Sequence, residues 1–191
     1  MSDEKPIKNN KGSFFPIVFV TAISLLMAVF WDQVPALKNS VHYVLDPSAG
    51  ALLNWNLTIG MIVVVFIITL ITTLIQKYTT DQNALRELRK EQKILQEEMK
   101  IHKDHPEKLN ELSKKQLEAI PKTFRLTSRA VLFTGIPFIL FFRWFYDFFN
   151  VLTVANNGIA PVFFGFISWF WFYLIFTLIF SGILRKWLNV V

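Results

Sequence analysis

The sequence predicts an all-α integral membrane protein, in which a small bundle of transmembrane helices carries a charged helical hairpin. Hydrophobic residues make up 53% of the 191 residues, and the 20 Phe and 6 Trp exceed what the interior of a soluble domain of this size could cover. Several segments without charge are long enough to cross about 30 Å of hydrocarbon as helices. One segment between them is instead crowded with charged helix formers.

Hydropathy divides the first part of the chain into a tail, a span, a loop and a second span. A tail over 1–13 precedes an apolar segment over 14–31, and no small-residue cleavage site follows it, which predicts a retained N-terminal transmembrane helix rather than a signal peptide. The extracytoplasmic loop over 32–54 carries apolar residues at helical spacing after Pro35, which predicts an amphipathic helix on the outer surface. The segment 55–76 contains no charge and predicts the next transmembrane helix.

A charged hairpin separates these spans from the last two. Residues 77–121 are rich in charged helix formers, and Pro106 is well placed to start the second arm of the hairpin. The segment 122–149 predicts a transmembrane helix with a cytoplasmic lead-in. A short extracytoplasmic loop over 150–160 follows, and 161–191 predicts the last transmembrane helix with a cytoplasmic C-terminus.

The distribution of basic residues predicts the orientation. Of the 20 Lys and Arg residues, 18 lie in the N-terminal tail, in 77–129 or at the C-terminus, and the outer loops hold only Lys38. Because loops rich in Lys and Arg stay on the cytoplasmic side, both termini and the hairpin are expected to face the cytoplasm. The sequence therefore predicts a multi-pass protein of the cell (plasma) membrane.

Apolar residues at coiled-coil spacing run along both arms of the hairpin and predict an antiparallel coiled coil. Its charge is mixed in sign with a modest basic excess, so two interpretations stay open. The hairpin is either a solvated spacer held by i,i+4 ion pairs, or a docking arm for a large anionic partner such as ribosomal RNA or acidic lipid. The predicted seam consists of Leu85, Leu88, Leu95 and Met99 in the first arm and Leu109 and Leu112 in the second.

Polar side chains form a stripe along three of the predicted spans, largely in the cytoplasmic half. A single Ser or Thr in a membrane helix commonly bonds to its own backbone and carries no function. Three stripes together instead predict a substrate groove that is wet at the cytoplasmic end and closed by apolar residues above. The predicted groove residues are Thr69, Thr72, Thr73, Gln76, Arg125, Ser128, Arg129, Arg143, Tyr173, Thr177 and Ser181.

Arg143 is the most costly of these residues, because a guanidinium in hydrocarbon costs at least a few kcal/mol unless it is paired or hydrated. Two interpretations stay open for it. Either Arg143 lines the groove, or it pairs with Asp147 one turn further on and snorkels outward.

The sequence offers no constellation for catalysis, metal binding or cofactor binding. It contains no Cys and three His, which excludes disulfides and thiolate zinc sites and argues against a histidine-rich metal site. It has no Gly-rich phosphate loop, and no His–Ser–Asp set or paired carboxylates converge. We therefore expect neither an enzyme nor a metal or cofactor.

The order of elements, an apolar helix, a charged hairpin, a proline-containing helix and an aromatic helix ending in Arg-Lys, resembles the archaeal branch of the YidC-type insertase superfamily. The insertase subunit of the endoplasmic reticulum membrane complex is a eukaryotic relative of that branch. The likeness covers 55–186. The motifs that carry it are Thr-Thr-Asp at 79–81, Leu-Arg-Lys-Glu-Gln at 88–92, Ile-Pro-Phe at 136–138, Phe-Arg-Trp-Phe at 142–145, Trp-Phe-Trp-Phe-Tyr at 169–173 and Ser-Gly-Ile-Leu-Arg-Lys at 181–186.

The resemblance implies a three-helix insertase core plus the N-terminal helix. It further implies that short hydrophobic segments of nascent or tail-anchored client proteins pass through a hydrophilic groove into the lipid bilayer. The hairpin would then engage the client, the ribosome or a targeting factor, and no DNA partner is expected. The groove arginine that bacterial members carry near mid-membrane has no equivalent, because Arg143 lies too far outward.

Two other function classes remain as alternatives. An ion (calcium) leak channel would need an acidic or carbonyl-rich lining, whereas the spans offer only Asp147 near their outer edge. A structural membrane tether would only hold the hairpin at the membrane. Replacement of the polar stripe by leucine would not affect the function of a tether, whereas it would inactivate an insertase.

Overall fold

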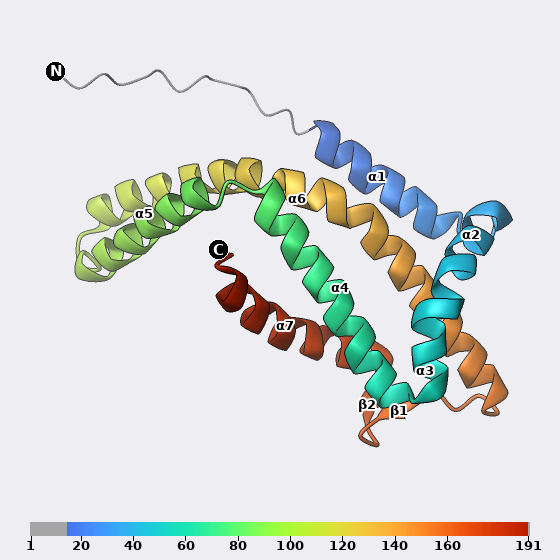
Figure 1. Ribbon diagram of the computed structural model, residues 1–191. Helices are drawn as coiled ribbons and strands as arrows, with labels where there is room; N and C mark the ends of the chain where they lie inside the picture. Colours follow the sequence, from blue (N-terminus) through green and yellow to red (C-terminus); the bar gives the residue numbers. More distant parts are fainter. Residues whose placement is uncertain (1–14, 191) are drawn as a thin grey trace.

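The computed structural model describes residues 15–190, without the side chains of 15–17 and Arg129, so the predicted tail over 1–13 lies outside the described residues. The described chain is mostly helical, and the all-α prediction is confirmed in outline (Figure 1). The elements in order are α1 (Phe15–Val29), α2 (Pro35–Leu45), the π-helical turn η1 (Asp46–Gly50), α3 (Ala51–Trp55), α4 (Leu57–Thr79), α5 (Gln82–Ile101), α6 (Pro106–Ala155), β1 (Val162–Phe163), β2 (Ile167–Ser168) and α7 (Trp169–Leu188).

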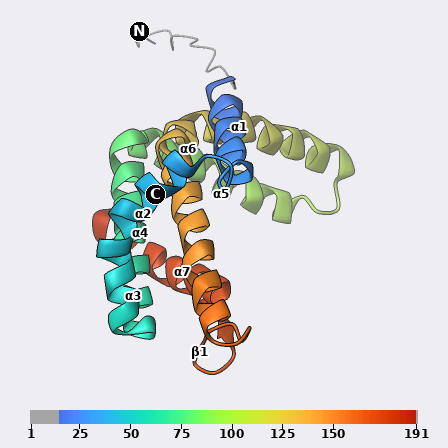
Figure 2. The ribbon, with the colours of Figure 1, turned by 90° about the vertical axis from the view of Figure 1, so that its right-hand side faces the viewer.

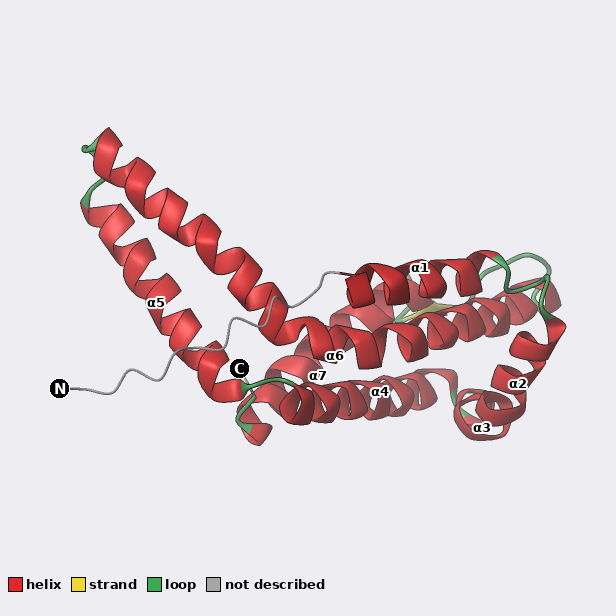
Figure 3. Cartoon of the chain, turned by 90° about the horizontal axis from the view of Figure 1, so that it is seen from above, coloured by secondary structure: helices red, strands yellow, loops and turns green. Residues whose placement is uncertain are grey.

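Three of the described helices are long and apolar enough to cross a membrane: α4, the part of α6 over 130–155, and α7. α4 packs along α7, while α1 packs along α6 (Figure 3). The described part of α1 has 15 residues, which correspond to about 22 Å of helix, and it starts where the described residues start. The full transmembrane span over 14–31 stays a prediction.

A chain of short helices connects α1 to α4 at the end of the bundle far from the hairpin. α2 occupies the segment in which the sequence predicts an amphipathic helix, and its Val41 and Leu45 pack against the hydrophobic core, whereas Val44 is exposed. The turn η1 and α3 then lead to Asn56, whose side chain accepts a hydrogen bond of 2.9 Å from the backbone N–H of Ile59. This bond caps one of the free N–H groups at the start of α4.

The hairpin and the third span share one helix. α6 runs unbroken through the boundary predicted between 77–121 and 122–149, although Pro121 and Pro137 lie inside it. Each proline removes a backbone N–H and favours a bend, but neither ends the helix here. α5 packs against the first part of α6, and the two arms extend sideways from the end of the bundle rather than along it (Figures 1 and 2).

The predicted seam residues of the hairpin lie between its two arms to different degrees. Gln92, at a seam position of α5, donates a long hydrogen bond of 3.4 Å to the hydroxyl of Thr123 on α6. Regular coiled-coil packing stays a prediction. Leu85, Leu88 and Leu112 are buried, whereas Leu95, Met99 and Leu109 are half-buried.

The chain turns back through a short β-hairpin before the last helix. α6 extends into the loop predicted over 150–160, and α7 begins at Trp169 rather than near Pro161. β1 and β2 pair antiparallel around a turn in which Phe164 and Gly165 have positive φ angles of 51° and 86°. Because this segment is as apolar as a membrane helix, hydropathy alone does not reveal the turn.

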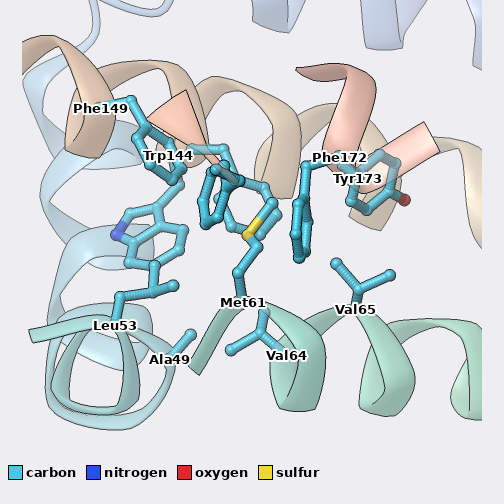
Figure 4. Close-up of a cluster of buried hydrophobic side chains, with 11 residues drawn as sticks. Ala49, Leu53, Met61, Val64, Val65, Trp144, Phe149, Phe172 and Tyr173 are labelled. Carbon is cyan, nitrogen blue, oxygen red and sulfur yellow. The ribbon is translucent and has the colours of Figure 1, made fainter. Parts of the chain in front are cut away.

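A cluster of aromatic and aliphatic side chains joins α3, α4, α6 and α7 at the far end of the bundle (Figure 4). The rings of Phe149 on α6 and Trp169 at the start of α7 stack with their centroids 5.5 Å apart. Large rings thus bridge α6 and α7 in stacked and edge-to-face contacts of the kind that stabilise aromatic clusters. The cluster consists of Ala49, Leu53, Met61, Val64, Val65, Trp144, Phe145, Phe149, Phe163, Phe172 and Tyr173.

Candidate functional site

A cavity of about 260 Å³ opens between α4 and α6 in the half of the bundle nearer the hairpin. Its walls are mostly apolar, because both helices turn aliphatic and aromatic residues toward it. Two hydroxyls interrupt these walls, Thr72 from α4 and Thr134 from α6. The lining residues are Ile67, Ile68, Ile71, Thr72, Ile75, Val131, Thr134, Gly135, Pro137, Phe138 and Phe141.

The threonines predicted as groove residues on α4 all bond to their own helix. The hydroxyls of Thr69, Thr72 and Thr73 each donate to the carbonyl four residues earlier, at 2.7, 2.8 and 2.7 Å. Thr69 and Thr73 are buried within the bundle, whereas Thr72 lines the cavity. Each hydroxyl has used its proton, so what it can still offer is an acceptor lone pair.

Gln76 is the predicted groove residue with the most specific partner. Its Oε1 accepts a hydrogen bond of 3.0 Å from the guanidinium of Arg185 on α7. The Nε of Arg185 is buried without a hydrogen-bond partner among the described residues. In the sequence, Arg185 contributes to the charge balance and to the motif at 181–186, and neither predicts its place beside Gln76. The helical register of α7 carries the only signal, since Arg185 follows Ser181 by four residues.

The predicted polar residues of α7 lie at different depths. The ring of Tyr173 packs against Phe142 and Phe145 of α6, with centroids 6.1 and 5.9 Å apart. The hydroxyl oxygen of Thr177 is buried, and Ser181 is half-buried nearer the hairpin. Tyr173 therefore belongs to the aromatic cluster as much as to a polar stripe.

Two of the predicted residues at the base of the hairpin, Arg125 and Ser128, lie outside the cavity lining. Arg125 is exposed, and the hydroxyl of Ser128 donates a hydrogen bond of 2.9 Å to the carbonyl oxygen of Arg125. The side chain of Arg129 lies outside the described residues. These positions flank the hairpin end of α6, and their role in a groove stays a prediction.

Arg143 does not line the cavity. Its guanidinium pairs with Asp32 at 3.1 Å and lies 5.8 and 5.6 Å from the ring centres of Trp31 and Tyr146. The predicted pairing of Arg143 with Asp147, one turn away on the same helix, is therefore wrong. The ion pair with Asp32 and the cation–π contact with Trp31 tie α6 to the segment that follows α1, while the contact with Tyr146 lies within α6.

Asp147 is the centre of a second polar cluster at the far end, which the sequence did not indicate. Its Oδ2 accepts hydrogen bonds from the indole of Trp31 at 2.7 Å and from Lys38 at 3.1 Å, and lies 3.3 Å from Nε2 of His42. Lys38 also bonds to Asp32, and this hydrogen bond raises the pKa of the Lys38 amine above its ordinary value. The cluster clamps α2 and the end of α1 onto α6.

Within residues 15–190, no group of three or more His, Asp and Glu side chains is arranged to hold a metal ion. What the described residues provide is an apolar cavity with two hydroxyls between α4 and α6, a half-buried Gln–Arg pair between α4 and α7 outside the cavity lining, and a charged clamp at the far end of the bundle. Such an arrangement can accommodate an apolar segment and contact its polar flank, and it contains no group poised for covalent chemistry.

Comparison with protein families gives one match. A family described as "Integral membrane protein EMC3/TMCO1-like" matches residues 42–191, which includes the cavity, the hairpin and the aromatic cluster but not α1. No curated protein and no solved structure matches the chain.

Proposed function

Because this chain belongs to the EMC3/TMCO1-like family of integral membrane proteins, we propose that it passes short hydrophobic segments of client membrane proteins into the bilayer. This family contains the insertase subunit of the endoplasmic reticulum membrane complex and is related to the YidC-type insertases. It is not a known enzyme family. The clients in this proposal are nascent or tail-anchored proteins.

The observation that carries the proposal is the cavity between α4 and α6. Its walls offer aliphatic and aromatic contacts to an apolar segment, while Thr72 and Thr134 offer lone pairs halfway along. In hydrocarbon, an unsatisfied backbone or side-chain polar group costs several kcal/mol, so such partners lower the barrier for a client that has not yet formed its helix.

The Gln76–Arg185 pair adds a polar contact between α4 and α7, near the hairpin end of both helices and outside the cavity lining. The buried Nε of Arg185 is a donor without a partner among the described residues, so it can bond a carbonyl or carboxylate of the client's flank. Arginine suits this role because its guanidinium stays charged and presents several N–H groups at once. In this proposal Arg185 provides the positive charge for which the sequence showed no equivalent.

The proposal includes an orientation. The hairpin and both termini face the cytoplasm in this proposal, since the basic residues gather in those segments, and the cavity lies in the half of the bundle nearer to them. The hairpin would meet the client, or the ribosome or targeting factor that delivers it. Lys108 and Lys115 are already engaged with Glu111, which leaves other basic residues for such a partner.

A matched pair of substitutions on α6 tests the proposal. Thr134 and Thr153 both donate to the carbonyl four residues earlier, at 2.8 and 2.7 Å, but only Thr134 lines the cavity. We expect Thr134→Leu, combined with Thr72→Leu, to reduce insertion of a short single-span client into proteoliposomes. Thr153→Leu should insert the client as well as the unmodified protein.

Three outcomes decide between the function classes. Equal insertion by both variants would show that the cavity hydroxyls take no part in insertion, and insertion no greater than in empty liposomes would overturn the proposal and favour the tether. Selective calcium flux in the same liposomes would instead favour the leak channel. The one acidic residue proposed for an ion pathway, Asp147, is a poor candidate for binding calcium. Trp31, Lys38 and His42 already contact its carboxylate.

A further inference from the structure

The hairpin has two broad faces, and one of them is turned toward the membrane. The two arms project sideways from the end of the bundle (Figures 1 and 2). One face of the hairpin is therefore on the same side as the membrane-spanning helices, and the other face is on the opposite side. Arg86 on α5 donates a hydrogen bond of 2.7 Å to the backbone carbonyl of Asn189, just beyond α7. The side of α5 that carries Arg86 is therefore the side facing the bundle.

The same side of α5 carries a stripe of basic residues. With about 100° between successive residues, four exposed basic side chains fall within an arc of about 60° on this helix. Glu87, Glu91 and Glu98 fall on the opposite edge, whereas Glu97 adjoins the stripe, so basic residues outnumber acidic ones on this side of the helix. The basic stripe consists of Arg86, Arg89, Lys93 and Lys100.

A stripe of large apolar residues lies on the facing arm. Leu117 and Ile120 of α6 are 63% and 58% exposed, and Phe124 is 36% exposed. These three residues also fall within about 60° of one another on their helix. Further along α6 the same helix side reaches Gly135, where α1 packs.

The two stripes share one face of the hairpin. Each lies about 100° from the seam of its own helix in the same rotational sense, and in an antiparallel pair equal sense means the same face. The opposite face mixes acidic, basic and apolar side chains, and Glu91, Ile94 and Lys115 line one cavity there. The membrane-facing side thus combines Lys and Arg with exposed Leu, Ile and Phe.

We propose that this face of the hairpin docks on the surface of a bilayer containing anionic lipid. Interfacial helices place Leu and Phe at the acyl boundary while Lys and Arg reach the headgroups, which is the pairing of residue types seen here. Nucleic acid would use the basic stripe but leave the three apolar residues in water, so the observations favour lipid. The inference requires only that the bundle spans a membrane and is independent of the insertase proposal.

Depth measurement with single labels tests the docking. The chain contains no Cys, so Leu117→Cys gives one fluorophore on the proposed face, and Ile94→Cys gives a matched one on the opposite face. The full chain is reconstituted in liposomes of neutral lipid alone, or with anionic lipid added, each with nitroxide-labelled lipid as quencher. We expect stronger quenching at position 117 than at 94, with a larger difference when anionic lipid is present. Equal quenching at both positions, or no dependence on lipid charge, overturns the proposal.

A charge series tests the basic stripe separately. Each Lys or Arg near an anionic surface strengthens attachment about fivefold, so neutralising three of them should shift the docking equilibrium about a hundredfold. The test variant is Arg89→Gln, Lys93→Gln and Lys100→Gln, and the control with the same change in net charge is Lys108→Gln, Lys115→Gln and Lys122→Gln. Circular dichroism verifies that both remain helical. An equal loss of quenching at position 117 in both variants overturns the proposal, as does protection of that label by ribosomal RNA but not by anionic lipid.

Discussion

Replacement of Gly60 by alanine tests how α3 is seated on α4. A Cβ atom at position 60 would lie 2.5 Å from the carbonyl carbon of Leu52 and 2.8 Å from the backbone nitrogen of Leu53, and closer still to the carbonyl oxygen of Leu52. Atoms in unstrained contact lie about 3.5 Å apart or more, so α3 must move by about 1 Å. Because these are backbone atoms and the Leu53 side chain is 2% exposed in the core, the displacement cannot be absorbed by a flexible side chain.

The loss of stability caused by the steric clash in Gly60→Ala can be separated from the effect of helix propensity. Overpacking typically costs about 1–3 kcal/mol, whereas alanine gains up to about 1 kcal/mol over glycine inside a helix. Gly182 of α7 provides the control, since a Cβ atom there meets nothing within 4 Å. Both variants gain the same propensity, so we expect Gly60→Ala to be less stable than Gly182→Ala by about 1–3 kcal/mol.

The measurement is reversible unfolding of the detergent-solubilised protein by added dodecyl sulfate, followed by far-ultraviolet circular dichroism. The unmodified protein should unfold between the two variants, or close to Gly182→Ala. If Gly60→Ala unfolds at the same dodecyl sulfate fraction as Gly182→Ala, then α3 is not packed against α4 as described.

Two further predictions concern the charged groups. Trp31→Phe removes a 2.7 Å hydrogen bond to the carboxylate of Asp147, which should lower the free energy of unfolding by about 1.5–3 kcal/mol in the same titration; no change would mean that the bond is not formed. In the hairpin, hydrogen bonds from Lys108 and Lys115 hold the pKa of Glu111 at about 2 instead of 4.5. This contribution to stability is present above pH 4.5 and is lost as pH falls toward 2, so NMR titration should give the low pKa, and Lys115→Gln should raise it.

The part of the fold that follows from local composition could be predicted from the sequence. The uncharged run of α4 and the aromatic run of α7 appear as membrane helices because each residue contributes to hydropathy independently of its neighbours. The two arms of the hairpin follow from helical periodicity in the same way. The start of α7 could not be predicted, because the β-turn at Phe164 and Gly165 depends on backbone conformation and not on polarity.

Of the two cavity hydroxyls, the sequence indicated Thr72 but not Thr134, and it did not indicate their surroundings. Thr72 was predicted on a polar stripe, and the structure places it in the cavity, but most of the lining is aliphatic and has no polar signature. The partners of Arg143 and Asp147 lie more than 100 positions away along the chain, so no local pattern could identify them. Arg143 was assigned Asp147 because that residue is the nearest acidic group on the same helix, whereas Asp32 becomes a neighbour only through the packing of α1.

The single helix α6 has a mechanical consequence. Its parts before and after residue 130 are about 36 Å and about 39 Å long, which makes it a lever with nearly equal arms. The far arm is held fast, since Trp144 bonds to Asp46 at 2.8 Å and Asp147 is clamped by Trp31 and Lys38. A force on the hairpin tip must then bend α6 where its backbone hydrogen bonds are interrupted. Pro121 and Pro137 are such points, and Pro137 also forms part of the cavity wall, so a bend there would change the shape of the cavity.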